Sequence, residues 1–223
     1  MARETLTREQ IVTAAIELLD ADGLEGLNMR SLGRRLGSAA TAVYWHVKNK
    51  DDLVVLAGDR VWDEIRLPDL DAVDWRTAGM AMAIDLHAMF GRHPWLVQAF
   101  ASHLFHGPGK ARHDDHSLAV YEAAGFVGEE ADRAAAAVFT YVLGNSLGQA
   151  ATASLERQLG KDGQDAAQRL QDTMDAARRT AMEFPRLRSR LEAADYAAAP
   201  DRSFESGLEA LFTGLAHRLP TSP

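Results

Sequence analysis

The feature that most restricts the fold is residues 28–50, NMRSLGRRLGSAATAVYWHVKNK, in which two short amphipathic patterns flank a glycine. Asn28 can cap a first helix, and Gly37 can adopt the left-handed conformation that ends it. The apolar residues between them recur at helical spacing: Met29, Leu32 and Leu36. Two helices joined by about three residues that include glycine form a helix-turn-helix, whose second helix enters the major groove of DNA. This stretch therefore predicts a DNA-reading element.

The second helix of this element is expected to follow Ser38, which can serve as its cap. Val43 and Val47 are four residues apart, so both would face the protein core. The other positions of this helix would then face outward, with His46 on the flank: Thr41, Ala42, Tyr44 and Trp45.

The charge of this stretch has one sign. Residues 28–50 contain five Lys or Arg and no Asp or Glu, whereas the whole chain has a net charge of −8. A cationic segment in an acidic protein suits phosphate binding, because neutralising phosphates releases counterions. Lys50 follows the helix cap Asn49, where the helix dipole disfavours a cation, and a bound phosphate would offset that cost. A solvated basic face on a small helical hairpin is the alternative, and the combination of turn, caps and charge favours DNA binding.

With residues 7–27 before it, this stretch resembles the DNA-binding domain of the tetracycline-repressor (TetR) family. The segment Tyr44–Lys50 is similar to the tetracycline repressors themselves. The resemblance is strong over about the first 65 residues and weaker afterwards. It implies an all-α, homodimeric transcriptional regulator with an N-terminal three-helix DNA-binding domain and a larger C-terminal domain that binds an effector and dimerises.

Candidate DNA contacts divide by role. Arg30, Tyr44 and Thr41 are expected to touch base edges or the groove, and four residues are expected to touch phosphates: Arg34, His46, Lys48 and Lys50. The resemblance implies operator contacts for four of these positions: Arg30, Tyr44, His46 and Lys50. Ala40, Thr41 and Ala42 differ from the residues that tetracycline repressors have at the start of the reading helix. The tetracycline operator is therefore not implied; the expected partner is a palindrome in double-stranded DNA, read by two heads.

Composition excludes several other classes of protein. The 223 residues contain no cysteine, which excludes disulfides and thiolate chemistry and fits a cytoplasmic protein. No signal peptide or membrane span is expected, and no cofactor. A glycine-rich phosphate loop and a nucleophile elbow are missing, so we do not expect an enzyme. A helical protein-interaction bundle that does not bind DNA is the remaining alternative, which the cationic stretch disfavours.

The rest of the chain is expected to be helical. We expect a connecting helix over residues 51–67 between a DNA-binding domain, residues 1–50, and an effector and dimerisation domain, residues 68–219, followed by a tail, residues 220–223. Further helices are predicted at 75–93, 95–105, 110–124, 129–159, 164–184 and 203–219, and residues 186–200 are predicted to be irregular.

The effector site is predicted from the helices that the resemblance folds around a cavity. Its candidate residues are mostly apolar with a few polar groups: Met82, Leu86, Met89, Phe100, His103, Ser117, Tyr121, Phe139 and Asn145. This composition suits a small, largely apolar ligand, although each of these residues could instead simply fill the core. The two positions that would reach the drug-bound magnesium in tetracycline repressors are Phe100 and Gly148. Neither side chain can bind a metal, so magnesium-tetracycline is not expected as the effector.

Small residues mark the expected dimer interface on the helices at 129–159 and 203–219: Gly144, Gly148, Gly207, Leu208, Leu211 and Gly214. The alternative is that this small-residue strip packs inside one subunit.

Four histidines suggest a second alternative, a metal-responsive regulator: His103, His106, His113 and His116. Imidazoles three residues apart on a helix can share a zinc ion. They flank a Gly-Pro-Gly loop, where solvated polar residues are common, so we expect no metal.

Overall fold

The structure is a computed structural model that describes residues 6–37, 40–162, 164–193 and 202–219, with side chains for all of these except 40, 41, 161, 162 and 164–167. Every regular element within these ranges is a helix, which confirms the predicted all-α fold. The helices are α1 (Arg8–Gly26), α2 (Met29–Arg35), α3 (Ala40–Val43), α4 (Lys50–Val61), a 3-10 turn η1 (Trp62–Glu64), α5 (Trp75–Arg92), α6 (Pro94–Ala99), α7 (Pro108–Ala124), α8 (Glu129–Asp162), α9 (Gln164–Met182), α10 (Pro185–Glu192) and α11 (Ser203–Ala216).

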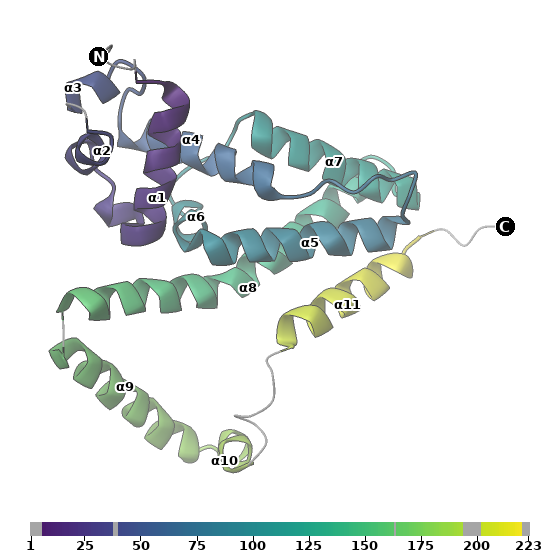
Figure 1. Ribbon diagram of the computed structural model, residues 1–223. Coiled ribbons are helices and arrows are strands. Elements are labelled where there is room, and N and C mark those ends of the chain that lie inside the picture. The colour runs from purple at the N-terminus through teal and green to yellow at the C-terminus, as the bar shows by residue number, and fades with distance from the viewer. Residues whose placement is uncertain (1–5, 38–39, 163, 194–201, 220–223) are drawn as a thin grey trace.

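Helices α1 to α3 form a small unit at the N-terminal end of the molecule (Figure 1), which we call the head. Thr7 and Gln10 form the capping box that starts α1, with Gln10 N donating to Thr7 Oγ1 at 3.2 Å and Thr7 N to Gln10 Oε1 at 2.9 Å. Gly23 has a φ of 70°, a conformation that glycine adopts without strain, and it interrupts the regular geometry of the helix.

The body consists of α5, α7 and α8, which pack on one another, with α6 against α8 and α11 along α5 and α8. The helix α4 leads from the head into this body, because it packs against α1 on one side and α7 on the other. One apolar core runs through both parts: Leu19, Leu32, Leu53, Trp62 and Phe90 are each at most 1% exposed and belong to the same cluster. The head is therefore packed onto the body and is not tethered by a free linker.

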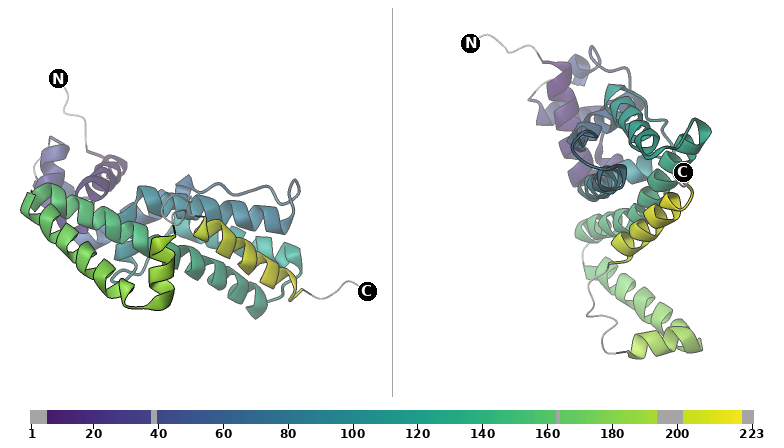
Figure 2. Two further views of the ribbon diagram at one scale, coloured as in Figure 1. Left: turned by 90° about the horizontal axis from the view of Figure 1, so that it is seen from below. Right: turned by 90° about the vertical axis from the view of Figure 1, so that its right-hand side faces the viewer.

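The C-terminal half of α8 extends beyond the body, and α9 and α10 follow it as an arm below the other helices (Figures 1 and 2). The prediction of irregular structure after residue 185 is wrong for the described part, because α10 is helical. Pro185 occupies the first turn of α10, where its fixed φ favours the start of a helix and its missing N–H costs nothing.

The helix predicted at 95–105 is shorter than expected and ends at Ala99. The chain then turns so that the ring of Phe105 lies against Gly58 of α4, where any larger residue would collide with it. Phe105 also packs on Phe100, with 4.8 Å between ring centroids. Tertiary packing of Phe105 therefore outweighs the helical spacing of this segment.

Within the described residues, no helix has both the length and the apolar character needed to cross a lipid bilayer.

Candidate DNA-binding surface and effector cavity

The start of α2 is built from local hydrogen bonds. Asn28 Oδ1 accepts from the main-chain N–H groups of Arg30 at 3.1 Å and Ser31 at 2.9 Å. Ser31 Oγ accepts in return from Asn28 N at 3.2 Å, which completes a capping box. Gly37 has a φ of 58°, the left-handed conformation expected of it. The cap and the helix stop predicted from the sequence are both confirmed, whereas Ser38 lies outside the described residues.

The side chains that follow divide between core and surface as the spacing predicts. Val43 is fully buried and Val47 is 4% exposed, whereas Tyr44 is 55% and Trp45 88% exposed. Two large aromatic side chains in water at the tip of a domain are unusual in a monomeric protein, and they are suited to groove or base contacts. The side chain of Thr41 is outside the described part, so its predicted contact stays a prediction.

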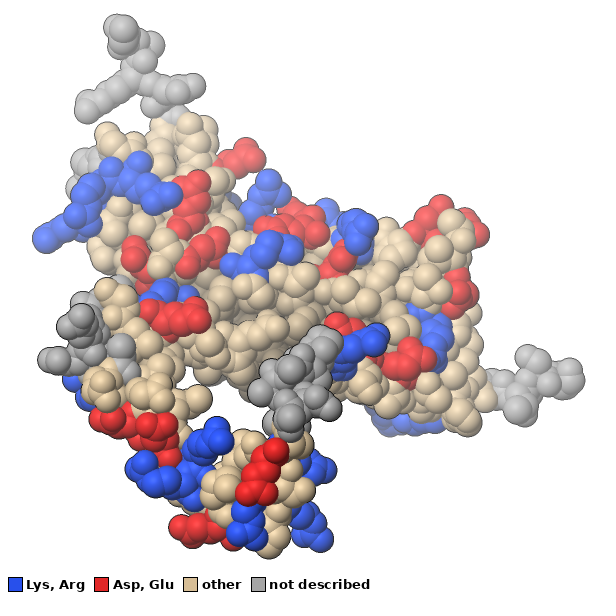
Figure 3. All heavy atoms as spheres, turned by 60° about the horizontal axis from the view of Figure 1, so that its bottom comes forward, with Lys and Arg blue, Asp and Glu red and all other residues tan. Residues whose placement is uncertain are grey.

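The cations of this surface differ in whether they form ion pairs within the protein. Arg30, Arg34 and Lys48 are exposed and form no ion pair with any residue that the structure describes. Arg35 is instead paired with Glu17 of α1 at 2.7 Å. Basic side chains project from the outer edge of the head (Figure 3). Among the described residues, three of the five cations of residues 28–50 are therefore exposed without an ion pair or a main-chain partner.

Lys50 has a role that the sequence did not indicate. Its Nζ donates to the main-chain oxygen of Leu24, at 2.5 Å, near the end of α1. This carbonyl supplies the negative partner that we had attributed to a DNA phosphate. Lys50 thereby joins the start of α4 to α1, and its contact with phosphate remains a prediction.

A narrow internal cavity of about 20 Å³ lies between α5, α7 and α8. Five of the nine predicted effector residues line it: Met82, Leu86, Ser117, Tyr121 and Phe139. Burial raises the pKa of the Tyr121 phenol, so this group is a neutral hydroxyl at physiological pH. A cavity of this size holds about one water molecule, whereas ligand pockets typically measure about 300–1,000 Å³.

The other four predicted effector residues do not line this cavity. Met89 is fully buried, and Phe100 packs between Phe90, Phe105 and Phe139. Asn145 Nδ2 donates to Tyr141 O within α8 at 2.8 Å. His103 lies 3.5 Å from Asp51 at the start of α4. Neither Asn145 nor His103 is among the residues that line the cavity with Ser117.

The sequence analysis missed several residues that do line the cavity: Gly79, Ala83, His113, Val120, Ala135 and Val138. His113 was recognisable, because it is four residues before Ser117 and eight before Tyr121 on one face of α7. Its ring is only 7% exposed and lies 4.7 Å from that of Trp62, at the end of the connecting segment.

The four histidines of the metal-responsive alternative do not come together. No group of three or more metal-binding side chains occurs in the part of the chain that is described. His113 is buried beside Trp62, and His106 Nδ1 lies 3.1 Å from Leu104 O. The alternative therefore has no structural support.

Comparisons with known proteins agree with this architecture. Residues 67–219 match the family model described as tetracyclin repressor-like, C-terminal domain. Residues 11–57 match the one described as bacterial regulatory proteins, tetR family. The chain belongs to the TetR family. Since its members are regulators of transcription and not enzymes, the prediction of a regulator is confirmed at this level.

Two curated relatives within the TetR family resemble the chain over part of its length. An HTH-type transcriptional regulator from Saccharopolyspora erythraea is 40% identical over 140 residues, which are 63% of this chain and 59% of that protein. The HTH-type transcriptional repressor DrrR1 from Streptomyces coeruleorubidus is 35% identical over 159 residues, 71% of this chain and 59% of DrrR1. The matched region thus spans about three fifths of each relative.

A solved structure covers almost the whole fold. The TetR-family protein ActR from Streptomyces coelicolor, crystallised in complex with (S)-DNPA, is 26% identical with a TM-score of 0.73. The match covers 96% of this chain and 99% of ActR.

In this TetR-family chain, the small residues assigned to a dimer interface fall into two groups. Leu208 is fully buried, and a larger residue at Gly207 would collide with the Tyr141 hydroxyl of α8. The prediction that Leu208 lies at a dimer interface is wrong, because α11 uses this face to pack inside its own subunit. Leu211 is partly buried against the same core.

The other group is open to solvent. Gly144 and Gly148 of α8 and Gly214 of α11 have no atom near enough to limit a larger side chain. Leu147, between the two glycines of α8, is 57% exposed, and Leu155 two turns later is 37% exposed. Helices α8 and α11 lie on the same side of the body, seen from below in Figure 2. Residues other than Lys, Arg, Asp and Glu cover much of this side (Figure 3), so it carries few charges, and the exposed leucines of α8 add apolar area to it.

Proposed function

We propose that this TetR-family chain is a homodimeric repressor that binds a palindromic operator and is released from it by a small, largely apolar effector. The observation that carries the proposal is the helix-turn-helix segment of the head. It combines three exposed cations that have no ion pair among the described residues, Arg30, Arg34 and Lys48, with the exposed rings of Tyr44 and Trp45. Cations without protein partners can neutralise phosphates at no cost in broken ion pairs. The curated name of DrrR1, a repressor, supports repression as the outcome.

The proposed dimer is supported by the exposed strip of α8. Gly144 and Gly148 permit close approach of a second backbone, and Leu147 supplies apolar area to bury. Two copies related by a two-fold axis would present two heads to one palindrome. A single short helix contacts too few base pairs for useful specificity, so the dimer is part of the reading mechanism.

Replacing Tyr44 with alanine is expected to weaken operator binding by roughly 1–3 kcal/mol, because an exposed ring that fills the groove is lost. The measurement is the dissociation constant on a duplex recovered by selection from random DNA. Phe184→Ala is the matched control, since Phe184 is 53% exposed, much like Tyr44, but lies in the arm. Equal affinities for Tyr44→Ala and the parent chain would refute the assignment.

The proposed effector enters between α5, α7 and α8, where Ser117, Tyr121 and His113 can orient an otherwise apolar ligand. ActR, of similar fold, was crystallised with the small molecule (S)-DNPA. Since the cavity of about 20 Å³ holds only about one water, ligand entry must displace its walls. Magnesium-tetracycline is not proposed, because Phe100 and Gly148 offer no metal ligand.

The helices that form the cavity walls, α5 and α7, bond to residues at the end of α4 and in η1. These contacts could couple effector binding to the position of the head. On one side, Asp59 Oδ1 accepts from Lys110 N at 2.9 Å and so caps the start of α7, and Arg112 of α7 pairs with Asp63. On the other side, Arg92 at the end of α5 pairs with Glu64 at 2.6 Å. Movement of α5 or α7 would shift α4 and with it the head. A 100-fold loss of operator affinity requires only about 2.7 kcal/mol of such coupling.

Gly109→Ala is expected to strain the contact between α7 and α4, because a Cβ at residue 109 would collide with the main-chain oxygen of Asp59. We expect a loss of about 1–3 kcal/mol in the free energy of unfolding, measured by denaturant titration, since a backbone atom cannot move aside as a side-chain end can. Gly160→Ala is the control: nothing lies near that helical position, so it should be neutral or stabilising by up to about 1 kcal/mol. Identical stabilities of the two variants would contradict the close approach of α7 to α4.

A further inference from the structure

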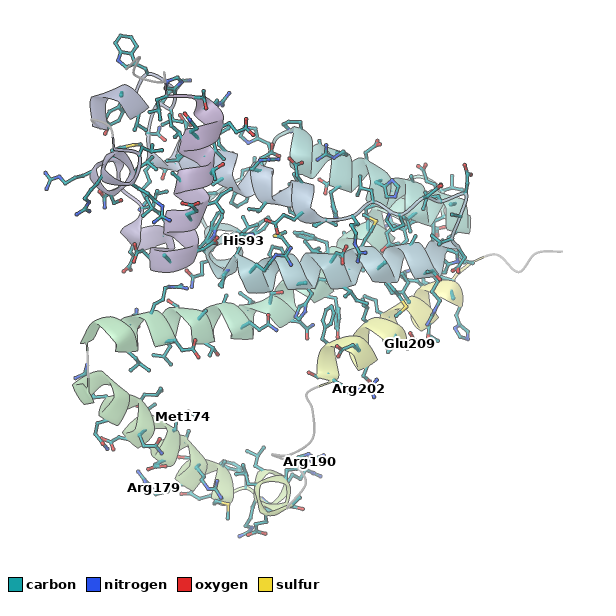
Figure 4. All side chains as sticks on the ribbon, viewed as in Figure 1. His93, Met174, Arg179, Arg190, Arg202 and Glu209 are labelled. Atoms are coloured by element: carbon teal, nitrogen blue, oxygen red, sulfur yellow. The ribbon has the colours of Figure 1, made fainter. Side chains whose placement is uncertain are left out.

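His93 occupies the corner between α5 and α6, directly beneath the head (Figure 4). It is 6% exposed, and both nitrogens of its ring have carboxylate partners. Nδ1 lies 2.7 Å from Asp20 Oδ1 of α1, and Nε2 lies 3.0 Å from Glu64 Oε1 of η1. One imidazole therefore joins the head, the end of the connecting segment and the body.

The groups around His93 favour its charged form. Asp20 also accepts from Trp95 Nε1 of α6 at 2.7 Å, and Glu64 accepts from Arg92 at 2.6 Å and 2.9 Å, so both carboxylates are held in place. These are the titratable and charged groups that face the ring from α1, η1, α5 and α6. Burial opposes protonation, but hydrogen bonds and negative charge, first from Asp20 and then from Glu64, raise the pKa of His93 above its usual value.

Protonation decides whether this bridge can exist. An imidazolium has two N–H donors and can donate to Asp20 and Glu64 together. A neutral imidazole has one donor, so one carboxylate would then face a nitrogen lone pair at the distances observed here. The bridge between head and body is complete only in the protonated state.

We propose that His93 is the positioning residue that holds the head at one angle on the body, and that loss of its proton lets the head shift about this corner while the shared apolar core stays packed. The inference deepens the proposed function, since the head is taken to be the DNA-reading unit. A repressor built this way would bind its operator with a pH dependence that originates at this corner, outside the reading surface and the effector cavity.

The sign of the effect follows from the direction of the shift. Because the pKa of His93 is higher in the folded chain, its bridge contributes stability fully below the unfolded value of about 6.5. That contribution is lost as the pH rises through the raised pKa. The head is therefore expected to be held at low pH and released at higher pH.

The test uses the whole chain without DNA or effector, so that it can fail independently of the proposed function. The chain has no native cysteine, which allows spin labels at Trp45→Cys in the head and Val127→Cys in the body, both exposed positions. Labelled chain is diluted with excess unlabelled chain so that only distances within one subunit are measured. The width of the distance distribution is followed from pH 5.5 to 9, and the His93 ring is titrated by NMR in parallel.

In the parent chain, the distribution should broaden with the same midpoint at which His93 titrates, above pH 6.5. Asp20→Asn should lower both midpoints by about one unit or more, because an adjacent opposite charge is removed. His93→Gln should abolish the pH response. His87→Gln is the matched control, since His87 also lies on α5 but stacks on Phe204 of α11, and it should keep the parent profile.

A merely structural His93 would change stability without moving the midpoint in Asp20→Asn. The proposal is overturned by a His93→Gln variant that keeps the parent pH response. It is also overturned by a distribution that does not change up to pH 9, whether His93 has titrated by then or still holds its proton.

Discussion

Leu147→Arg is expected to turn the proposed dimer into a monomer and to lower operator affinity on the order of 100-fold or more, because two linked heads would gain this much from binding together. Leu147 is 57% exposed within one subunit and lies between Gly144 and Gly148, at the centre of the open strip of α8. An arginine there would place two like charges near the two-fold axis and bury them without partners. Sedimentation velocity measures the first effect and a binding titration the second.

The matched control for this substitution is Val127→Arg. Val127 is 79% exposed just before α8, away from the open strip, so the added charge should leave both mass and affinity unchanged. A Leu147→Arg chain that still sediments as a dimer would show that α8 does not provide the interface. A parent chain that is monomeric at all concentrations would refute the proposed dimer.

Leu208→Ala is expected to cost about 2–5 kcal/mol of folding free energy and to leave association unchanged once the chain is folded. Leu208 is fully buried between α11 and the rest of its own subunit, so truncation leaves a cavity in the core. Thermal or denaturant unfolding measures the loss.

Leu187→Ala on α10 serves as its control, because a half-exposed leucine, 50% exposed here, should change stability by no more than about 0.5 kcal/mol. A Leu208→Ala chain of unchanged stability that dissociates into monomers would instead restore Leu208 to the interface.

Much of the head could be predicted from the sequence, although the reading helix α3 ends at Val43, so Tyr44 and Trp45 lie in the turn after it and not on the helix as expected. Its elements are short and set by local chemistry: Asn28 and Ser31 form a capping box, Gly37 has a φ of 58°, and Asn49 Oδ1 accepts from Asp52 N at 2.7 Å. Such signals involve residues within three positions of one another, so tertiary packing has little chance to override them.

Helix α11 shows where sequence reasoning stops. Its small residues Gly207 and Gly214 looked like one strip, yet Gly207 approaches Tyr141 of the same subunit and Gly214 faces solvent. A glycine allows a neighbouring atom to come close, but the sequence does not show whether that atom belongs to the same subunit or to another one. Periodicity gives the face of a helix, whereas the partner on that face depends on long-range packing.

The effector cavity was predicted in part for the same reason. Residues on α5 and α7 with helical spacing, such as Met82, Leu86 and Tyr121, do line the cavity, and their contact with an effector stays a prediction. Phe100 and His103 were misplaced because the chain turns after Ala99, and that turn is fixed by Phe105 packing on α4. The bridge at His93 could not be foreseen, since its partners Asp20 and Glu64 are 73 and 29 residues away in the chain.

We expect the assembly to read DNA with two heads, each of which neutralises phosphates through Arg30, Arg34 and Lys48. The most direct measurement is selection of bound duplexes from a random pool, followed by the salt dependence of the affinity for the selected duplex. We expect a palindrome with half-sites about one or more helical turns apart and a log-log salt slope of about −5, for roughly six neutralised phosphates. A pool without an enriched sequence, or an affinity that does not change with salt, would contradict it.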